Sequence, residues 1–406
     1  MKVCVLCTDV DIPVLGSEGC SVKIRQFCDT LIEQGHDVVV LCAWAGESDG
    51  AHTEARIEEI QPEGAARSAW DALARDPAVL DANLERDLRS LMMNDWLLES
   101  GARVLEAERP QLVYERYALF GLAGAELARH VGAAHLLEVN APLCREQEGY
   151  EKFPLIRTAE ALEGEIMRSA GSVLAVSAWV RDFALGYGVD PKRIELMPNG
   201  VAAHFAGTFS GEAVRERLGL SGSRVVGYLG SFQPWHDISG LVDVFAHLRE
   251  RNRDLQLLLV GDGPEREAIA DHASAVSLSD AVVMTGHVEP DQVPDHIAAM
   301  DVAVSPYRER EDFYFSPLKL FECMAVGRPN VAARIGQIEE VVDDGQTGVL
   351  YPAGDTRALG TVLDSVLADP ERGKRIGEAG RRKVLSEHTM AANAERVVGL
   401  AEEGIA

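Results

Sequence analysis

The sequence predicts an α/β protein with two domains, each built on its own parallel sheet. The first observation is length, because 406 residues exceed what one hydrophobic core usually holds. The second is that short apolar runs alternate with helical patterns along the chain, which is typical of repeated strand–helix units. The third is that this alternation pauses near residues 198–201 and starts again at residues 224–230. Together these observations indicate two similar sheets joined by a linker.

The pattern also gives expected boundaries. We expect the first domain at residues 1–200 and the second at 201–385, with a C-terminal helix at about 386–406 packing back on the first. The expected strands of the first domain are residues 3–6, 38–42, 112–114, 135–139, 173–176 and 194–197. Those of the second are residues 224–230, 255–260, 282–284, 302–305, 330–332 and 348–350. The first helix is expected at about 21–34, and inserted helices at about 65–109.

Composition excludes several classes of protein. Hydrophobic residues make up 47% of the chain and charged residues 26%, which is ordinary for a globular protein and not for a disordered or fibrous one. The formal net charge of -26 disfavours binding to nucleic acid or anionic lipid, so soluble small or neutral partners are favoured. No apolar run approaches the ~20 residues that cross a bilayer. The N-terminal apolar stretch is shorter than a signal-peptide core, so we expect a cytoplasmic protein, with a homo-oligomer possible.

No metal or other cofactor is expected. The seven cysteines have no regular spacing, which suits free thiols in a reducing compartment. Cys4 and Cys7 lie three apart on an expected strand, where their side chains point to opposite faces. Asp9 and Asp11 are similar to a metal-binding Asp-x-Asp but lack its surrounding pattern. The glycine-rich stretch at 261–266 has an arginine where a dinucleotide fingerprint needs its third glycine, so it does not predict NAD binding.

The segment from Ser316 to Glu322 is the most informative for chemistry. Ser316 is suited to cap a helix, with Pro317 as its first residue, and the free amides there would attract an anion such as a diphosphate. Lys319 in the first turn adds positive charge. Glu322 follows one turn later, where it could accept hydrogen bonds from ribose hydroxyls. The alternative is an exposed Lys319–Glu322 pair on an ordinary helix.

This Ser-Pro-Leu-Lys-Leu-Phe-Glu segment resembles the signature of glycosyltransferase family four, a large retaining family with the GT-B fold of two facing Rossmann-like domains. The resemblance spans nearly the whole chain, in the expected order. The matching motifs are residues 16–19, 35–38, 199–201, 230–232, 235–236, 260–264, 285–288 and 345–348. The resemblance therefore implies two doubly wound domains facing across a cleft, with the nucleotide on the second.

The resemblance also implies roles for residues of the second domain. Glu322 matches the glutamate expected on the nucleotide ribose. The residues implied to bracket the base, largely through their backbone, are Gly286, His287 and Val288. Those implied to hold the diphosphate and the donor sugar are Ser316, Pro317, Leu318 and Lys319.

Two departures from the family pattern concern the donor. Tyr314 stands where the family usually has a first glutamate on the donor sugar. Ser231 and His236 stand where the arginine and lysine of the diphosphate clamp are usual. Either His236 contacts phosphate in their place, or it packs with Trp235 as a turn residue.

The first domain carries fewer signals. Gly19 lies where a loop backbone can approach the phosphates and a side chain would obstruct them. The segment 113–117 stands where many family members have a histidine facing the donor sugar, so either Arg116 or Glu115 serves there or no residue does, and Arg116 could equally form a salt bridge. Glu138 and Asn140 share one face of an expected strand end, so one of them either touches the donor sugar or acceptor or serves as a structural cap. Lys319, Glu138, His236 and Arg116 are thus the candidate catalytic residues.

The function implied by the resemblance is retaining transfer of a sugar from a nucleoside diphosphate sugar to a soluble small-molecule or saccharide acceptor. Front-face attack, with the departing phosphate taking the acceptor proton, needs no enzymic nucleophile and fits the missing carboxylate at Tyr314. The alternatives are epimerisation, phosphorolysis or transfer to a thiol by the same fold, and a catalytically silent binding protein. The sequence does not specify the donor base, the sugar or the acceptor.

Overall fold

The computed structural model describes residues 1–47, 51–76, 82–148 and 153–405. The chain forms two compact units, which are described separately below. Unit 1 comprises residues 1–198 and 390–406, and unit 2 comprises residues 199–389. The chain therefore enters unit 2 between Pro198 and Asn199 and returns to unit 1 between Thr389 and Met390.

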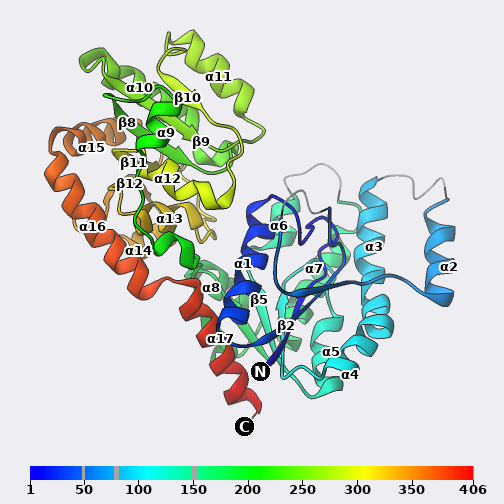
Figure 1. Cartoon of the computed structure of the whole chain (residues 1–406). Coiled ribbons are helices and arrows are strands. Elements are labelled where there is room, and N and C mark those ends of the chain that lie inside the picture. The colour runs from blue at the N-terminus through cyan, green and yellow to red at the C-terminus, as the bar shows by residue number, and fades with distance from the viewer. Residues whose placement is uncertain (48–50, 77–81, 149–152, 406) are drawn as a thin grey trace. The chain divides into compact units, whose positions relative to one another are not determined.

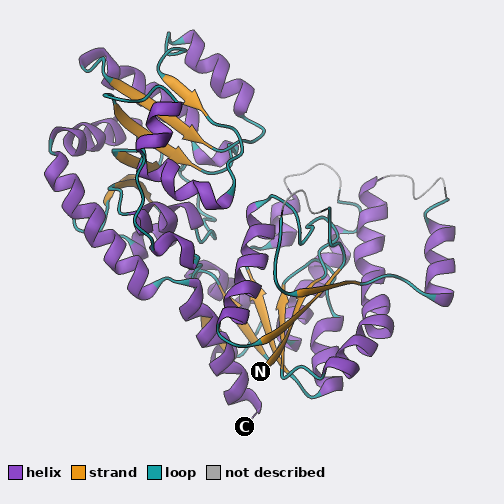
Figure 2. Ribbon diagram, in the orientation of Figure 1, coloured by secondary structure: helices purple, strands orange, loops and turns teal. Residues whose placement is uncertain are grey.

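Unit 1 is a seven-stranded parallel sheet with helices on both faces (Figures 1 and 2). Its strand order is β3-β2-β1-β4-β5-β6-β7. The strands are β1 Lys2–Cys7, β2 Asp37–Cys42, β3 Arg56–Glu59, β4 Leu112–Arg116, β5 Ala134–Val139, β6 Ser172–Ala175 and β7 Ile194–Leu196. The α-helices are α1 Gly19–Glu33, α2 Gly64–Leu73, α3 Ala82–Trp96, α4 Ala102–Glu108, α5 Ala123–Val131, α6 Leu143–Glu148, α7 Ile156–Ser169, α8 Ala178–Gly186 and α17 Met390–Ile405. The C-terminal helix α17 packs on α1 and β5.

Unit 2 repeats this design with six parallel strands in the order β10-β9-β8-β11-β12-β13. The strands are β8 Arg224–Leu229, β9 Leu255–Val260, β10 Val282–Met284, β11 Val302–Ser305, β12 Asn330–Arg334 and β13 Val349–Pro352. The α-helices are α9 Glu212–Arg217, α10 Ile238–Arg251, α11 Arg266–Ala275, α12 Val293–Ala298, α13 Leu318–Val326, α14 Gln337–Val341, α15 Thr356–Ala368 and α16 Pro370–Glu387. Counted within the unit, this is the Rossmann strand order 3-2-1-4-5-6, so the predicted α/β doubly wound class is confirmed.

The side chains of strand β1 alternate between the hydrophobic cores on the two faces of the sheet. Cys4 and Leu6 pack on one face of the sheet, whereas Val3, Val5 and Cys7 pack on the other. Because side chains alternate along a strand, Cys4 and Cys7 cannot share a site, as the spacing predicts. Cys4 and Cys7 are both buried free thiols.

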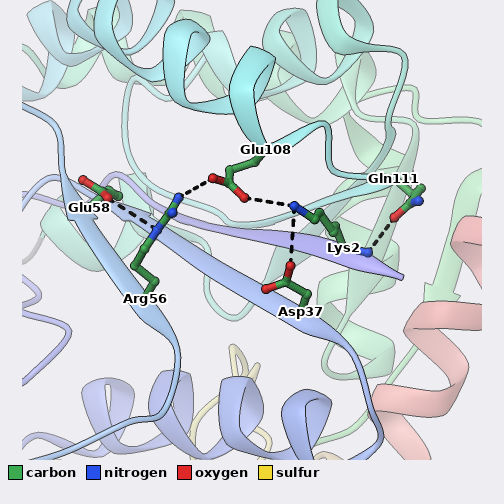
Figure 3. A network of polar contacts seen from close by, with 6 residues as sticks. All are labelled: Lys2, Asp37, Arg56, Glu58, Glu108 and Gln111. Carbon is green, nitrogen blue, oxygen red and sulfur yellow. Dashed lines mark hydrogen bonds and ion pairs between the residues drawn. The ribbon is translucent and has the colours of Figure 1, made fainter.

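The sequence analysis missed one strand, β3. Its residues are polar and partly exposed, so no apolar run marks it, and it lies at the edge of the sheet. Ion pairs hold this corner together instead (Figure 3). Glu108 accepts hydrogen bonds from Arg56 Nη2 at 2.8 Å and from Lys2 Nζ at 3.2 Å, and Lys2 Nζ lies 3.5 Å from Asp37. The inserted helices expected near residues 65–109 are present as α2, α3 and α4.

Candidate active site

Most candidate residues lie after the strands that flank the point where the strand order of their sheet reverses, whereas Glu138 and Asn140 lie at the end of β5 and residues 286–288 follow β10. In unit 1 the reversal lies between β1 and β4, and in unit 2 between β8 and β11. At such a point the loops leaving neighbouring strands turn to opposite faces, which opens a crevice outside the carboxyl ends of the strands. Each unit therefore offers a binding edge of its own.

The start of α13 in unit 2 differs from the prediction by one residue. Pro317, with ψ of 98°, is the N-cap residue, and the helix begins at Leu318. Ser316 does not cap it, because its hydroxyl accepts the Asn199 backbone N–H at 2.9 Å and its carbonyl accepts the Asn199 side-chain amide at 2.8 Å. The N-cap residue Pro317 provides no side-chain cap, so the first amides of α13 can donate to an anion.

Lys319 is a buried cation that has no carboxylate partner among the described residues. Its residue is only 9% exposed, and Nζ donates a hydrogen bond to the Tyr228 hydroxyl at 2.9 Å. The ammonium also lies 4.7 Å above the Tyr228 ring and 4.9 Å above the Tyr307 ring. Burial lowers the pKa of Lys319 well below its usual value. A bound anion would supply the missing negative charge.

Glu322 lies one turn beyond Lys319 on α13. Among the described residues it forms neither an ion pair nor a side-chain hydrogen bond, so the exposed Lys319–Glu322 pair considered above is absent. Desolvation raises the pKa of Glu322 to about 7, and Lys319 offsets only part of that effect. Its carboxylate is thus available to accept hydrogen bonds from a ligand.

His236 follows β8 and is nearly enclosed, with 7% of the residue exposed. Its Nδ1 lies 2.6 Å from the Ser231 carbonyl and 2.9 Å from the Tyr228 hydroxyl. Burial and the charge of Lys319 lower the pKa of His236 to about 2. The ring is therefore neutral at physiological pH and supplies no formal charge to a phosphate. It nevertheless belongs to the Lys319 cluster, by which we mean Lys319, Tyr228 and His236.

Three glycines shape the backbone of this edge. Gly230 and Gly261 both have φ of +130°, and a Cβ atom on Gly261 would lie 2.1 Å from the Gly230 carbonyl oxygen. The loops after β8 and β9 thus meet backbone to backbone. Gly286 has φ of +72° and forms a bridge with Gly261, followed by an exposed His287 and by Val288, which packs on the core. The predicted base-bracketing loop therefore joins the same edge.

The loop between β11 and α13 is rich in aromatic residues. Tyr314, which stands where the family usually has a glutamate, is buried, and the Arg310 guanidinium lies 5.7 Å from its ring centre. Phe315 stacks on Trp235 at a centroid distance of 6.1 Å. The aromatic side chains fix this loop beside His236 and Lys319.

In unit 1, Glu138 and Asn140 at the end of β5 are joined by Lys23 of α1. Lys23 Nζ donates to Glu138 Oε1 at 2.6 Å and to Asn140 Oδ1 at 2.9 Å, and Asn140 Nδ2 donates to Glu138 Oε2 at 2.8 Å. Burial alone would raise the pKa of Glu138, but Lys23, Arg116 and these hydrogen bonds outweigh it and lower the pKa to about 2. The carboxylate stays ionised and is a poor proton acceptor at neutral pH.

The sequence analysis missed Lys23, because 115 residues separate it from Glu138 and no local motif marks it. Gly19 begins α1, and a Cβ there would meet no atom within 4 Å, so space is open above the helix start. Arg116 ends β4, and its Nε is buried without a partner among the described residues, so the salt bridge considered for it is absent. Glu115 is unavailable, because it pairs with His135 at 2.8 Å inside the core.

Within the described residues, no three acidic, histidine or cysteine side chains converge closely enough to hold a metal ion. None of the described helices has the length and apolar character needed to cross a membrane.

Two doubly wound units, each with polar residues at its topological switch point, define the GT-B class of glycosyltransferases. Two family descriptions match the chain: "Glycosyl transferase 4-like domain" over residues 18–200 and "Glycosyl transferases group 1" over residues 223–369. The chain belongs to this glycosyltransferase family and is a glycosyltransferase enzyme, as the sequence analysis expected.

Similar proteins include several named transferases and synthases. A GDP-mannose-dependent alpha-(1-6)-phosphatidylinositol monomannoside mannosyltransferase of Mycolicibacterium smegmatis is 33% identical over 264 residues, covering 64% of this chain and 68% of the relative. An alpha-maltose-1-phosphate synthase of the same organism is 30% identical, covering 82% and 88%.

Among solved structures, the sucrose-phosphate synthase of Thermosynechococcus elongatus has a TM-score of 0.73 at 20% identity, covering 99% of this chain and 98% of that one. The Anabaena protein HepE, crystallised with UDP and glucose, has a TM-score of 0.73 at 17% identity and covers 99% and 100%. These structures support the fold.

Proposed function

We propose that this enzyme transfers a sugar, with retention at the anomeric carbon, from a nucleoside diphosphate sugar whose diphosphate binds at the start of α13. The observation that carries the proposal is Lys319, a buried ammonium that pairs with no carboxylate in the described part of the chain, next to helix amides for which the N-cap residue Pro317 provides no side-chain cap. Similar proteins support the donor class. One relative is named as a GDP-mannose-dependent mannosyltransferase, and the structurally similar HepE was crystallised with UDP and glucose. Glu322 takes the ribose hydroxyls in this proposal.

The chemistry follows from where charge develops. As the bond between the sugar and the diphosphate breaks, negative charge builds on the β-phosphate, and preorganised donors stabilise that charge most in the transition state. Lys319 and the amides of Leu318 and Lys319 are such donors. His236 is neutral, so Lys319 is the side chain beside it that faces the diphosphate as a cation, because a bound anion favours the charged form that burial disfavours.

Transfer also requires a group that takes the proton from the attacking atom of the acceptor. Glu138 is a poor base at neutral pH, since its pKa is about 2, and Tyr314 replaces the usual carboxylate. We therefore assign the departing phosphate as the proton acceptor in a front-face reaction. Glu138 then serves to fix Lys23 and Asn140 at the edge of unit 1, where Gly19 and Arg116 also lie.

The acceptor we propose is a soluble small molecule or saccharide. The net charge of -26 supports this choice, because a strongly acidic protein is repelled by anionic membrane surfaces. Adding anionic vesicles is accordingly expected to leave the turnover of a soluble acceptor unchanged.

The donor is tested first by thermal shift against a panel of nucleoside diphosphates. A ligand at roughly 100 times its Kd stabilises the protein by about 2.7 kcal/mol. The preferred nucleotide then identifies the donor for assays of nucleotide release. Release that depends on an added acceptor supports transfer, release without acceptor supports hydrolysis or epimerisation, and the anomeric configuration of the product by NMR reports retention.

Lys319→Ala tests the site itself. We expect it to lower kcat/KM by about 100-fold or more, since it removes the charge facing the leaving group, while the far-UV circular dichroism stays that of the wild type. Lys374→Ala, at an exposed position on α16, is the control and is expected to be neutral. Wild-type rates for Lys319→Ala would refute the proposed site.

A further inference from the structure

The Lys319 ammonium has a specific protein partner, the hydroxyl of Tyr228. Tyr228 lies on β8, is fully buried, and accepts the hydrogen bond from Nζ at 2.9 Å. The same hydroxyl lies 2.8 Å from the Ser231 carbonyl and 2.9 Å from His236 Nδ1. One phenol thus contacts the cation, the loop after β8 and the neighbouring histidine.

One arrangement of protons satisfies all these contacts. The Ser231 carbonyl can only accept, and His236 Nδ1 lies 2.6 Å from it, so Nδ1 must carry the proton of the neutral ring. The Tyr228 hydroxyl donates its single proton to the same carbonyl, and its oxygen accepts from Lys319 Nζ and faces the Nδ1 proton of His236 at 2.9 Å. His236 Nε2 is consequently left as an acceptor. It can accept a hydrogen bond from a ligand hydroxyl but cannot donate one to a phosphate oxygen.

The backbone of Gly230 closes one side of the group formed by Lys319 and Tyr228. A Cβ atom on Gly230 would lie 3.3 Å from the Tyr228 hydroxyl and 3.4 Å from Lys319 Nζ. The ammonium is therefore held between the glycine backbone and two aromatic rings, and the hydroxyl of Tyr228 sets its direction. A lysine side chain without such an acceptor populates several rotamers.

We propose that Tyr228 is a positioning residue, whose hydroxyl fixes the Lys319 ammonium for the diphosphate and orders the Ser231 carbonyl and His236 around it. This inference rests on the proposed function, because it takes the diphosphate as the ligand of Lys319. It adds a residue that no motif in the sequence identified, and it gives His236 the role of hydroxyl acceptor.

The test replaces Tyr228 with phenylalanine, which keeps the ring under the ammonium and removes the hydroxyl alone. Binding of UDP or GDP, whichever the full-length wild type prefers, is measured by isothermal titration calorimetry beside the matching nucleoside monophosphate. We expect Tyr228→Phe to weaken the diphosphate about 5- to 30-fold and the monophosphate less than about twofold, since the proposed function places against Lys319 the β-phosphate that the monophosphate lacks. Tyr187→Phe, which removes a tyrosine hydrogen bond to Glu163 in unit 1, is the matched control.

A double variant separates positioning from a general structural role. If Tyr228 acts through Lys319, then Lys319→Ala with Tyr228→Phe binds diphosphate no more weakly than Lys319→Ala alone. Additive losses, or equal losses for diphosphate and monophosphate, would overturn the inference.

The two proposals fail in different ways. Unchanged diphosphate affinity in Tyr228→Phe, together with a loss in Lys319→Ala, refutes the role of Tyr228 and leaves the proposed function standing. Unchanged affinity in Lys319→Ala refutes the proposed function itself. Thermal melts of each variant verify that the compared proteins are folded.

Discussion

Lys319 and Glu322 carry opposite charges on successive turns of α13, yet they form no ion pair within the described chain. The rings of Tyr228 and Tyr307 contact the ammonium, and Glu322 is a half-buried residue whose carboxylate is desolvated. Leaving two desolvated charges unpaired costs stability. Such a cost is typical of residues kept for a ligand, because a nucleotide would offer phosphate to one and hydroxyls to the other.

Glu322→Gln is expected to reveal this cost. The pKa of Glu322 is raised to about 7 from an unfolded value near 4.5, so its ionised form opposes folding as the pH rises through that window. The variant should therefore be more stable than the wild type at pH 8, by about 1–3 kcal/mol, and nearly equal to it at pH 4.5. Urea unfolding at both pH values measures the difference.

The same variant should bind the nucleoside diphosphate about tenfold more weakly, because a neutral amide accepts ribose hydroxyls less well than a carboxylate. A variant that is less stable than the wild type at pH 8 would contradict the desolvation argument, whatever its affinity.

At the scale of elements, the loops after parallel strands build the site, and glycines let them approach. The loops after β8 and β9 meet at Gly230 and Gly261, and the first of these lies directly over Tyr228 and Lys319. A side chain at Gly261 would separate the loops, and one at Gly230 would press on the Tyr228 hydroxyl and the Lys319 ammonium. The geometry of the cation thus depends on a backbone contact between two elements.

Gly261→Ala tests this dependence. Its Cβ would lie 2.1 Å from the Gly230 carbonyl, and its φ of +130° is unfavourable for alanine, so we expect a loss of about 2–4 kcal/mol in stability and a lower affinity for nucleoside diphosphate. Gly219→Ala is the matched control, because that glycine also has positive φ but open space around its Cβ. Equal losses of stability in the two variants would show that the loop contact is unimportant.

At the scale of the whole molecule, each unit has a hydrophobic core made only of its own residues. The core of unit 2 runs from Val201 to Val384, whereas one core of unit 1 takes Met390, Ala394, Val397 and Ala401 from the C-terminal helix α17. The last helix of the chain is therefore part of the first unit. Truncating it would open the core of unit 1 and spare that of unit 2.

We expect residues 199–389 to fold on their own and to bind the nucleoside diphosphate, because their core and the Lys319 cluster are complete within them. A cooperative thermal melt that shifts upward with UDP or GDP would verify this. Residues 1–198 alone should be destabilised, since the apolar residues of α17 are missing. A fragment 199–389 that does not melt cooperatively would show that unit 2 depends on unit 1.

The sequence by itself determined the α/β class, nearly every strand and the signature on α13, because apolar runs, glycine stops and helix signals are local in the chain. It did not find β3, whose polar edge residues give no such run, and it began α13 one residue early, because Asn199 holds Ser316 from across the unit. Tertiary structure alone decided that Lys23 joins Glu138 and that Tyr228 holds Lys319. Those pairs are 115 and 91 residues apart, and only the parallel sheets, which bring distant strand ends to one edge, make them neighbours.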